Sequence, residues 1–147
     1  MRKMSDWKEN IKRIINLLEK NNAAKVVVIA GLNENALQKE FAVVLAEGIK
    51  ERNKRVGFID VIEKQDTTGS VVEKVEKELF ELKEKNDYVI INNLCIASYA
   101  AAVAVCAFAD ETILVIESGT INGNRAMELK RELDMNGVHV LGSIFIK

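Results

Sequence analysis

The 147-residue chain contains no proline, two cysteines and a single histidine. Without proline, no proline-rich linker or cis-prolyl turn interrupts it. Cys95 and Cys106 lack the spacing of metal ligands, and His139 alone supports neither a zinc site nor a histidine-based triad. The sequence therefore predicts no metal site. We interpret both cysteines as small buried apolar residues and His139 as a structural residue.

An excess of charge of one sign is also missing. The chain has 21 Lys and Arg against 22 Asp and Glu, a formal charge of -1. This balance argues against a nucleic-acid-binding protein, which is usually strongly basic. No apolar run approaches the roughly 18–20 residues that span a bilayer, and Met1–Met4 lacks the apolar core of a signal peptide. We expect a cytoplasmic protein with no nucleic-acid partner.

Five short segments rich in β-branched residues recur along the chain. Each is nearly continuous in apolar side chains, which is typical of strands buried on both faces of a parallel sheet. These segments are Lys25–Ala30, Arg55–Asp60, Tyr88–Asn92, Thr112–Glu117 and Val138–Ile146.

Segments with apolar residues at helical spacing lie before and between these runs. One of them starts with Ser70 and Glu73, the pattern of a capping box. The alternation of helices and strands predicts a three-layer α/β protein with five parallel strands. We expect one domain over residues 1–147, with an N-terminal amphipathic helix in 1–22 and an α/β core in 25–147.

The turn after the first predicted strand is the first place to look for a binding site, because open parallel sheets bind ligands at the carboxyl ends of their strands. A phosphate-binding loop there would read G-x-x-x-x-G-K-[ST]. When Lys39 is aligned with the lysine of this motif, Asn33 and Gln38 occupy the two glycine positions and Glu40 occupies the Ser/Thr position. Only the lysine of the motif is present.

Five stretches follow the strand sequences of one known family. They are Lys25–Gly31 (KVVVIAG), 54–60 (KRVGFID), 86–92 (NDYVIIN), 107–116 (AFADETILVI) and 136–142 (NGVHVLG). On these residues the chain resembles the MinD/ParA-type P-loop ATPases, and most closely the cytoplasmic bacterial tyrosine kinases of capsule and exopolysaccharide synthesis. The resemblance spans about residues 25–147. It implies a P-loop NTPase-like sheet with strand order 2-3-1-4-5.

The chain departs from this family at the residues that handle nucleotide. The family's signature lysine falls at Glu34, and its magnesium-binding hydroxyl falls at Glu40. The D-x-D motif of the kinases reads Asp60-Val61-Ile62, and the Walker B aspartate is replaced by Asn92. Each carboxylate at about 4–5 Å from a phosphate would cost a few kcal/mol at an effective dielectric constant of about 20. These departures predict that no cofactor is bound.

Two functions therefore remain open. The first is a degenerate, non-catalytic relative of the capsule kinases that acts as a protein-interaction or regulatory module. The alternative is a divergent kinase or ATPase that uses ATP and Mg²⁺. It would have Lys39, Asn33 and Asn92 as candidate nucleotide-binding residues and Asp60 as the candidate catalytic residue. Structural interpretations compete with each role: a solvated helix residue for Lys39, a turn or helix cap for Asp60, and a turn residue for Asn92.

Residues 1–25 contain seven Lys or Arg and three Asp or Glu, a local charge of +4. A basic amphipathic helix of this kind can contact an anionic membrane or a partner. Alternatively, it packs its apolar residues on the sheet. The resemblance implies a protein partner, either a membrane-bound polysaccharide co-polymerase or an active kinase homologue. Self-association through this helix and a peripheral position at the inner membrane face are further expectations.

Overall fold

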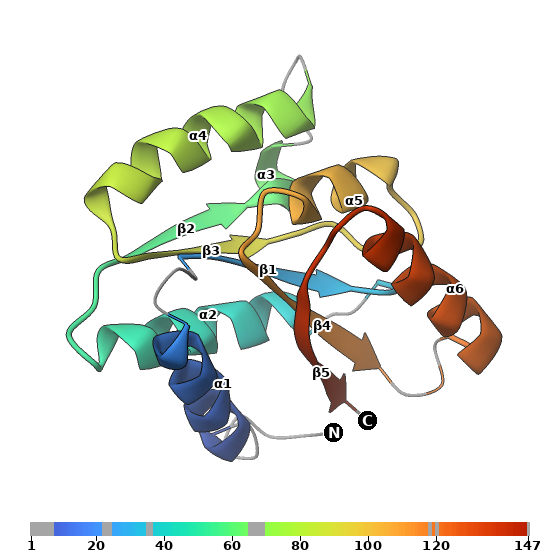
Figure 1. Cartoon of the computed structure of the whole chain (residues 1–147), viewed down its shortest axis with the longest axis horizontal. Coiled ribbons are helices and arrows are strands. Elements are labelled where there is room, and N and C mark those ends of the chain that lie inside the picture. The colour runs from blue at the N-terminus through green and yellow to red at the C-terminus, as the bar shows by residue number, and fades with distance from the viewer. Residues whose placement is uncertain are drawn as a thin grey trace.

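A five-stranded parallel sheet forms the centre of the protein (Figure 1). The computed structural model describes residues 8–21, 25–34, 37–64, 70–117, 119 and 121–146. The strand order is β2-β3-β1-β4-β5, which confirms the order that the family resemblance implied. The strands are β1 (Val26–Gly31), β2 (Val56–Asp60), β3 (Tyr88–Asn92), β4 (Glu111–Glu117) and β5 (Val140–Ile146).

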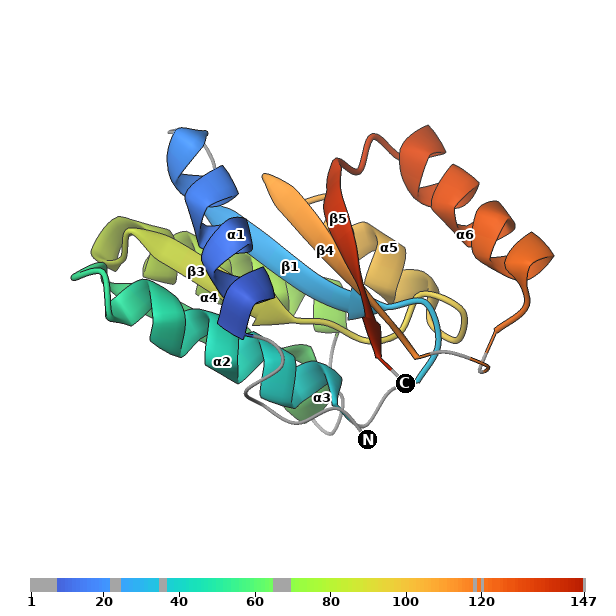
Figure 2. The ribbon, with the colours of Figure 1, turned by 90° about the horizontal axis from the view of Figure 1, so that it is seen from below.

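Helices cover both faces of the sheet, as Figure 2 shows from below. The side chains of α1 and α2 form one hydrophobic core with the sheet, and those of α3, α4, α5 and α6 form the other. The helices are α1 (Lys8–Lys20), α2 (Gln38–Lys50), α3 (Val61–Lys64), α4 (Val71–Lys85), α5 (Ala100–Cys106) and α6 (Gly123–Met135). Among the described residues, no helix is long and apolar enough to cross a membrane.

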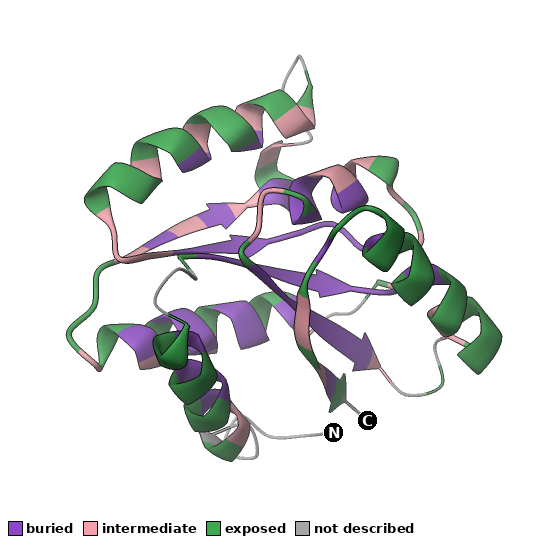
Figure 3. Ribbon diagram, in the orientation of Figure 1, coloured by how far each residue is buried: buried purple, intermediate pink, exposed green. Residues whose placement is uncertain are grey.

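The central strands are buried as the continuous apolar runs predict, but the two outer strands are not (Figure 3). All six residues of β1 are buried. In β2 only alternate residues are buried, and in β5 the side chain of Phe145 is 56% exposed. The prediction of burial on both faces was therefore wrong for β2 and β5. An outer strand has a neighbour on one side only, and the helices pack mainly over the middle of the sheet.

The apolar face of α1 belongs to the core. Ile11, Ile14, Ile15 and Leu18 are at most 8% exposed and lie in one cluster with buried residues of α2, β1 and β4. The interpretation that this face packs against the rest of the protein is therefore confirmed for these four residues. Trp7, an apolar residue four positions before Ile11, lies outside the described residues.

Local sequence signals set several helix ends. The hydroxyl of Ser70 accepts a hydrogen bond from the Glu73 N–H at 3.3 Å and caps α4, as the capping-box pattern predicts. Asn122 caps α6 in the same way through the Arg125 N–H at 2.8 Å. The short helix α3 was not predicted, because its four residues are too few to show a helical period.

Candidate functional site

Gln38 is the first residue of α2, and its side chain is buried at the carboxyl ends of β1 and β3. Its Nε2 lies 2.7 Å from the Asn93 carbonyl oxygen, 2.9 Å from the Asn92 Oδ1 and 3.2 Å from the Ile29 carbonyl oxygen. Two amide hydrogens are thus shared among three acceptors. The side chain ties the start of α2 to the two central strands.

The loop between β1 and α2 folds into the core next to this glutamine. The Leu32 side chain is fully buried among core residues on the α4 and α5 side of the sheet. The carbonyl oxygens of Gly31 and Leu32 accept hydrogen bonds from the N–H groups of Ile96 and Ala97, at 2.8 and 2.9 Å. The loop is therefore held by the segment that follows β3. Residues 35 and 36 lie outside the described residues.

Gly31 shows how closely protein atoms fill the end of β1. A Cβ atom added at this residue would lie 2.5 Å from the Asn33 carbonyl oxygen and 2.8 Å from the Gln38 Oε1. Both distances are shorter than any normal carbon–oxygen contact. Glycine is needed at this position because the chain folds back over its own strand end.

Lys39 and Asp60 form an ion pair at the same edge of the sheet. The Lys39 Nζ lies 2.8 Å from the Asp60 Oδ2 and 3.8 Å from the Glu63 Oε1. The Asp60 side chain is 7% exposed and that of Lys39 is 54% exposed. The hydrogen bond that Lys39 donates to Asp60 and the negative charge of Asp60 raise the pKa of Lys39. The lysine is thus fully protonated at neutral pH and already has an anionic partner.

Three of the four candidate residues come together here. Asp60 accepts hydrogen bonds from the Ile62 N–H at 3.1 Å and from the Asn92 Nδ2 at 3.4 Å, in addition to its pair with Lys39. The interpretation of Asp60 as a turn or helix cap matches its bond to Ile62 at the start of α3. Asn33 instead accepts a hydrogen bond from the N–H of the next residue at 2.9 Å.

The sequence interpretation assigned no structural role to Gln38. The signal was present: Gln38 precedes Phe41, Ala42, Leu45 and Ile49 at the helical spacing that places all of them on the buried face of α2. The alignment to a phosphate-binding loop treated this residue only as a missing glycine.

The residues at this edge do not fit a magnesium nucleotide. Magnesium takes oxygen ligands in a near-octahedral arrangement. Here one Asp60 oxygen is paired with Lys39, and the Asn92 Oδ1 accepts from Gln38. Across the part of the chain that the structure describes, no three His, Cys, Asp or Glu side chains gather closely enough to hold a metal ion.

The two cysteines are buried, and the histidine pairs with a residue at the start of β4. Both cysteines are buried, and burial raises the pKa of Cys106 to about 11, so its thiol is not ionised at neutral pH. His139 precedes β5, and its Nδ1 lies 2.5 Å from a carboxylate oxygen of the buried Glu111 at the start of β4. It therefore sits at the amino edge of the sheet, opposite the candidate site.

Comparison with known proteins gives structural relatives only. No family model and no curated protein sequence matches the chain. The kinase domain of VpsO is similar over 99% of both chains, with 12% identity and a TM-score of 0.78. The kinase domain of the Escherichia coli tyrosine kinase ETK is similar over 89% of this chain and 69% of its own, with 16% identity and a TM-score of 0.71.

The cell division protein MinD of Aquifex aeolicus also has this fold. It matches over 84% of this chain and 70% of its own, with 14% identity and a TM-score of 0.65. These neighbours belong to the two groups that the sequence resembled, bacterial tyrosine kinases and MinD-type ATPases. At such identities the likeness establishes the P-loop NTPase-like fold.

Proposed function

We propose that this chain is a non-catalytic member of the tyrosine-kinase-like P-loop fold that acts as a protein-interaction or regulatory module. The observation that carries the proposal is the buried side chain of Gln38, which bonds to the ends of β1 and β3 where a nucleotide-binding loop would leave room for phosphate. The similarity to VpsO and ETK, both described as kinase domains, supports the kinase-like lineage.

A phosphate-binding loop works by turning several backbone N–H groups toward the anion, with glycines that allow close approach. The corresponding loop here places the apolar side chain of Leu32 in the core and binds the segment after β3 through its own carbonyl groups. The cation nearest the start of α2, Lys39, is paired with Asp60, and Glu34 and Glu40 are exposed beside it in the chain. A nucleotide would have to displace bonds that the protein already makes.

A chain that keeps the fold but not the nucleotide site retains surfaces for protein contacts. We propose a protein partner from capsule or exopolysaccharide synthesis, either a membrane-bound polysaccharide co-polymerase or an active kinase homologue, with the protein at the cytoplasmic side of the membrane. The kinase-like fold supports this choice, because a degenerate domain of the same shape can occupy the place of an active one. Co-purification with candidate co-polymerases and kinases tests it.

Calorimetric titration with ATP and Mg²⁺ tests the loss of nucleotide binding. We expect a dissociation constant in the millimolar range or weaker, which is about -4 kcal/mol or less favourable. Lys39→Ala should not alter this result, and Lys50→Ala, a change at an exposed lysine at the other end of α2, serves as its control. Micromolar binding that only Lys39→Ala abolishes would overturn the proposal.

The alternative function, a divergent ATP-binding kinase or ATPase of the MinD/ParA type, rests on one observation. Lys39, Asp60 and Asn92 do lie together at the carboxyl edge, as such an enzyme would require. For Lys39 to bind phosphate, it would have to leave Asp60. The titration above decides between the two functions, because the enzyme requires micromolar binding that depends on Lys39.

A further inference from the structure

The single histidine of the chain is paired with a buried carboxylate at the amino edge of the sheet. The His139 Nδ1 lies 2.5 Å from the Glu111 Oε2. The Glu111 side chain is 5% exposed, whereas that of His139 is 70% exposed. Because a carboxylate only accepts hydrogen bonds, the proton of the neutral ring lies on Nδ1. The free electron pair of the ring is then on Nε2.

The imidazole of His139 is held on one side and open on the other. Among the residues that the structure describes, none bonds its Nε2. The backbone around it is fixed, because the His139 carbonyl oxygen accepts from the Thr112 N–H at 2.9 Å and the Val138 N–H donates to the Leu133 carbonyl oxygen at 3.0 Å. A histidine that acts as a nucleophile needs this arrangement, with one ring nitrogen oriented by a carboxylate and the other free.

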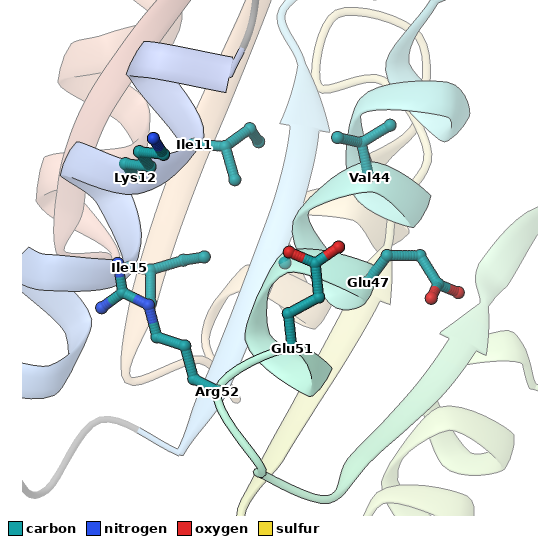
Figure 4. A pocket seen from close by; sticks show the side chains of 8 residues that line it. Ile11, Lys12, Ile15, Val44, Glu47, Glu51 and Arg52 are labelled. Carbon is teal, nitrogen blue, oxygen red and sulfur yellow. The ribbon is translucent and has the colours of Figure 1, made fainter.

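Glu111 is itself supported by the end of α1. Its Oε1 accepts a hydrogen bond from the Asn21 Nδ2, just after the helix, at 3.4 Å. Figure 4 shows Arg52, at the groove between α1 and α2, extending from the turn after α2 toward α1. Its Nη1 lies 2.6 Å from the Glu19 Oε1 and 2.9 Å from the Asn16 Oδ1. The last turns of α1 are thus tied to α2, and the carboxylate beneath His139 has a fixed position.

The amino edge around this pair has charges of both signs. Asp110 accepts hydrogen bonds from the N–H groups of Lys25 and Val26 at 2.8 Å each, so its carboxylate is already engaged. Lys20 ends α1, directly before Asn21, and the side chains of Lys20 and Lys25 are exposed. An anion added at this edge therefore has cations as well as carboxylates near it.

We propose that the Nε2 of His139 accepts a phosphoryl group from a donor with a phosphorus–nitrogen bond, and that Glu111 is the positioning residue. The Nε2 electron pair forms the new bond to phosphorus, and the phosphorus–nitrogen bond of the donor breaks. With phosphoramidate as the donor, the leaving nitrogen takes that bonding pair and departs as ammonia. The ring keeps its Nδ1 proton and becomes a cation, which the Glu111 carboxylate stabilises.

A donor of this class fits the site because one phosphorus–nitrogen bond replaces another, so the transfer needs no nucleotide. The modification goes beyond the proposed function, since it takes place at the edge of the sheet opposite Gln38 and Lys39. It would add negative charge to the surface beside the start of β5.

Treatment of the folded protein with phosphoramidate tests the proposal, with mass spectrometry and NMR to identify the modified ring nitrogen. Met127→His provides a second histidine as an internal control. Met127 is 62% exposed on α6, and no Asp or Glu lies three or four residues from it. Both histidines of this variant meet the same reagent. We expect His139 to react about tenfold faster and on Nε2 alone, and the introduced histidine to react on both nitrogens.

Glu111→Gln separates orientation of the ring from its exposure. An amide can donate to Nδ1 as well as accept from it, so the ring is no longer held in one tautomer. We expect a rate about tenfold lower and phosphate on both nitrogens, with circular dichroism to show that the variant is folded. If it does not fold, the comparison of two histidines within Met127→His still decides.

Three results would overturn the proposal. They are equal rates for the two histidines of Met127→His, phosphate on the Nδ1 of His139, and a folded Glu111→Gln protein that reacts like the wild type. ATP titration does not enter this test, so its failure and that of the non-catalytic function can be told apart.

Discussion

The two edges of a parallel sheet usually have different roles in an α/β protein. Ligands bind at the carboxyl edge, where the strands end, and the amino edge, where they begin, is structural. In this chain the polar residues at both edges make the same kind of internal bond. At the amino edge, Asp110 accepts from the N–H groups of Lys25 and Val26 at 2.8 Å each. At the carboxyl edge, Gln38 and Asp60 are equally engaged with strand and helix ends. The polar residues of both edges are therefore held by bonds within the protein.

The edges differ in how deeply these bonds are buried. Gln38 and Asn92 at the carboxyl edge are 6% and 1% exposed. Asp110 at the amino edge is exposed, and so is the Lys25 N–H that it binds. Water can replace a lost partner around Asp110 but not around Gln38, so breaking the bonds of Gln38 should cost more.

The largest effect is expected for Gln38→Leu, which keeps the volume of the side chain and removes its amide. The Asn93 carbonyl oxygen and the Asn92 Oδ1 lose their donor, at about 1–3 kcal/mol for each buried unpaired group. We expect a loss of about 2–4 kcal/mol in the free energy of unfolding, measured by urea denaturation. Lys39→Ala, at the next residue, should lower the stability far less than Gln38→Leu, because the lysine is half exposed. An unchanged or more stable Gln38→Leu protein would show that the carboxyl edge is not structural.

The next effect is expected for Asp110→Ala at the amino edge. The change removes two hydrogen bonds to a carboxylate, but the exposed backbone N–H of Lys25 can then donate to water instead. We expect a loss of about 1–2 kcal/mol in the same assay. Asp134→Ala on the exposed surface of α6 is the control and should be nearly neutral. A loss equal to that of Gln38→Leu would remove the difference between the two edges.

The fold was predictable because its signals are local. Continuous β-branched runs placed all five strands to within two residues, and Ser70 marked the start of α4. The exposure of β5 was not predictable from its own residues. The apolar run Val140–Ile146 has the sequence pattern of a central strand, and only the pairing of strands shows that β5 is an outer strand.

The candidate site was predictable only in part. The positions of Lys39, Asp60 and Asn92 at one edge follow from the order of strands, and the structure brings them together. The bonds that Gln38 makes depend on three-dimensional neighbours from β1 and from the end of β3, far away in the chain. Helical spacing indicates that Gln38 is buried but not what it binds.

A smaller effect is expected for the Glu111 and His139 pair at the amino edge. Glu111 is buried, and its carboxylate is held by a histidine whose side chain is 70% exposed. A double-mutant cycle with Glu111→Gln and His139→Ala should give a coupling of about 0.5–1 kcal/mol, because solvent weakens a pair with one exposed partner. A coupling of about 3 kcal/mol or more would place the amino edge on a par with the buried network of the carboxyl edge.

The smallest effects are expected in the pH dependence of stability, where the two edges should differ in direction. At the amino edge, hydrogen bonds from the Arg55 N–H and guanidinium lower the pKa of Asp87 below its ordinary value of 3.8. The bond therefore stabilises the fold above that ordinary value, and the stabilisation is lost as the pH falls through the lowered pKa. At the carboxyl edge, Asp60 raises the pKa of Lys39 above 10.5, so that its stabilisation is complete below 10.5 and is lost as the pH rises through the raised pKa.

These two changes can be separated by unfolding midpoints measured against pH. The difference between the wild type and Asp87→Asn should shrink as the pH falls below about 4 and stay constant in alkali. The difference between the wild type and Lys39→Met should shrink above about pH 10.5, where the lysine loses its proton. Both differences should be small, since Asp87 and Lys39 are partly exposed and solvent screens their charges. Raising the salt concentration should reduce both further, because screening weakens exposed pairs. If the Lys39→Met difference did not change in alkali, Lys39 would not be the charged partner of Asp60, and the ion pair at the candidate site would have to be abandoned.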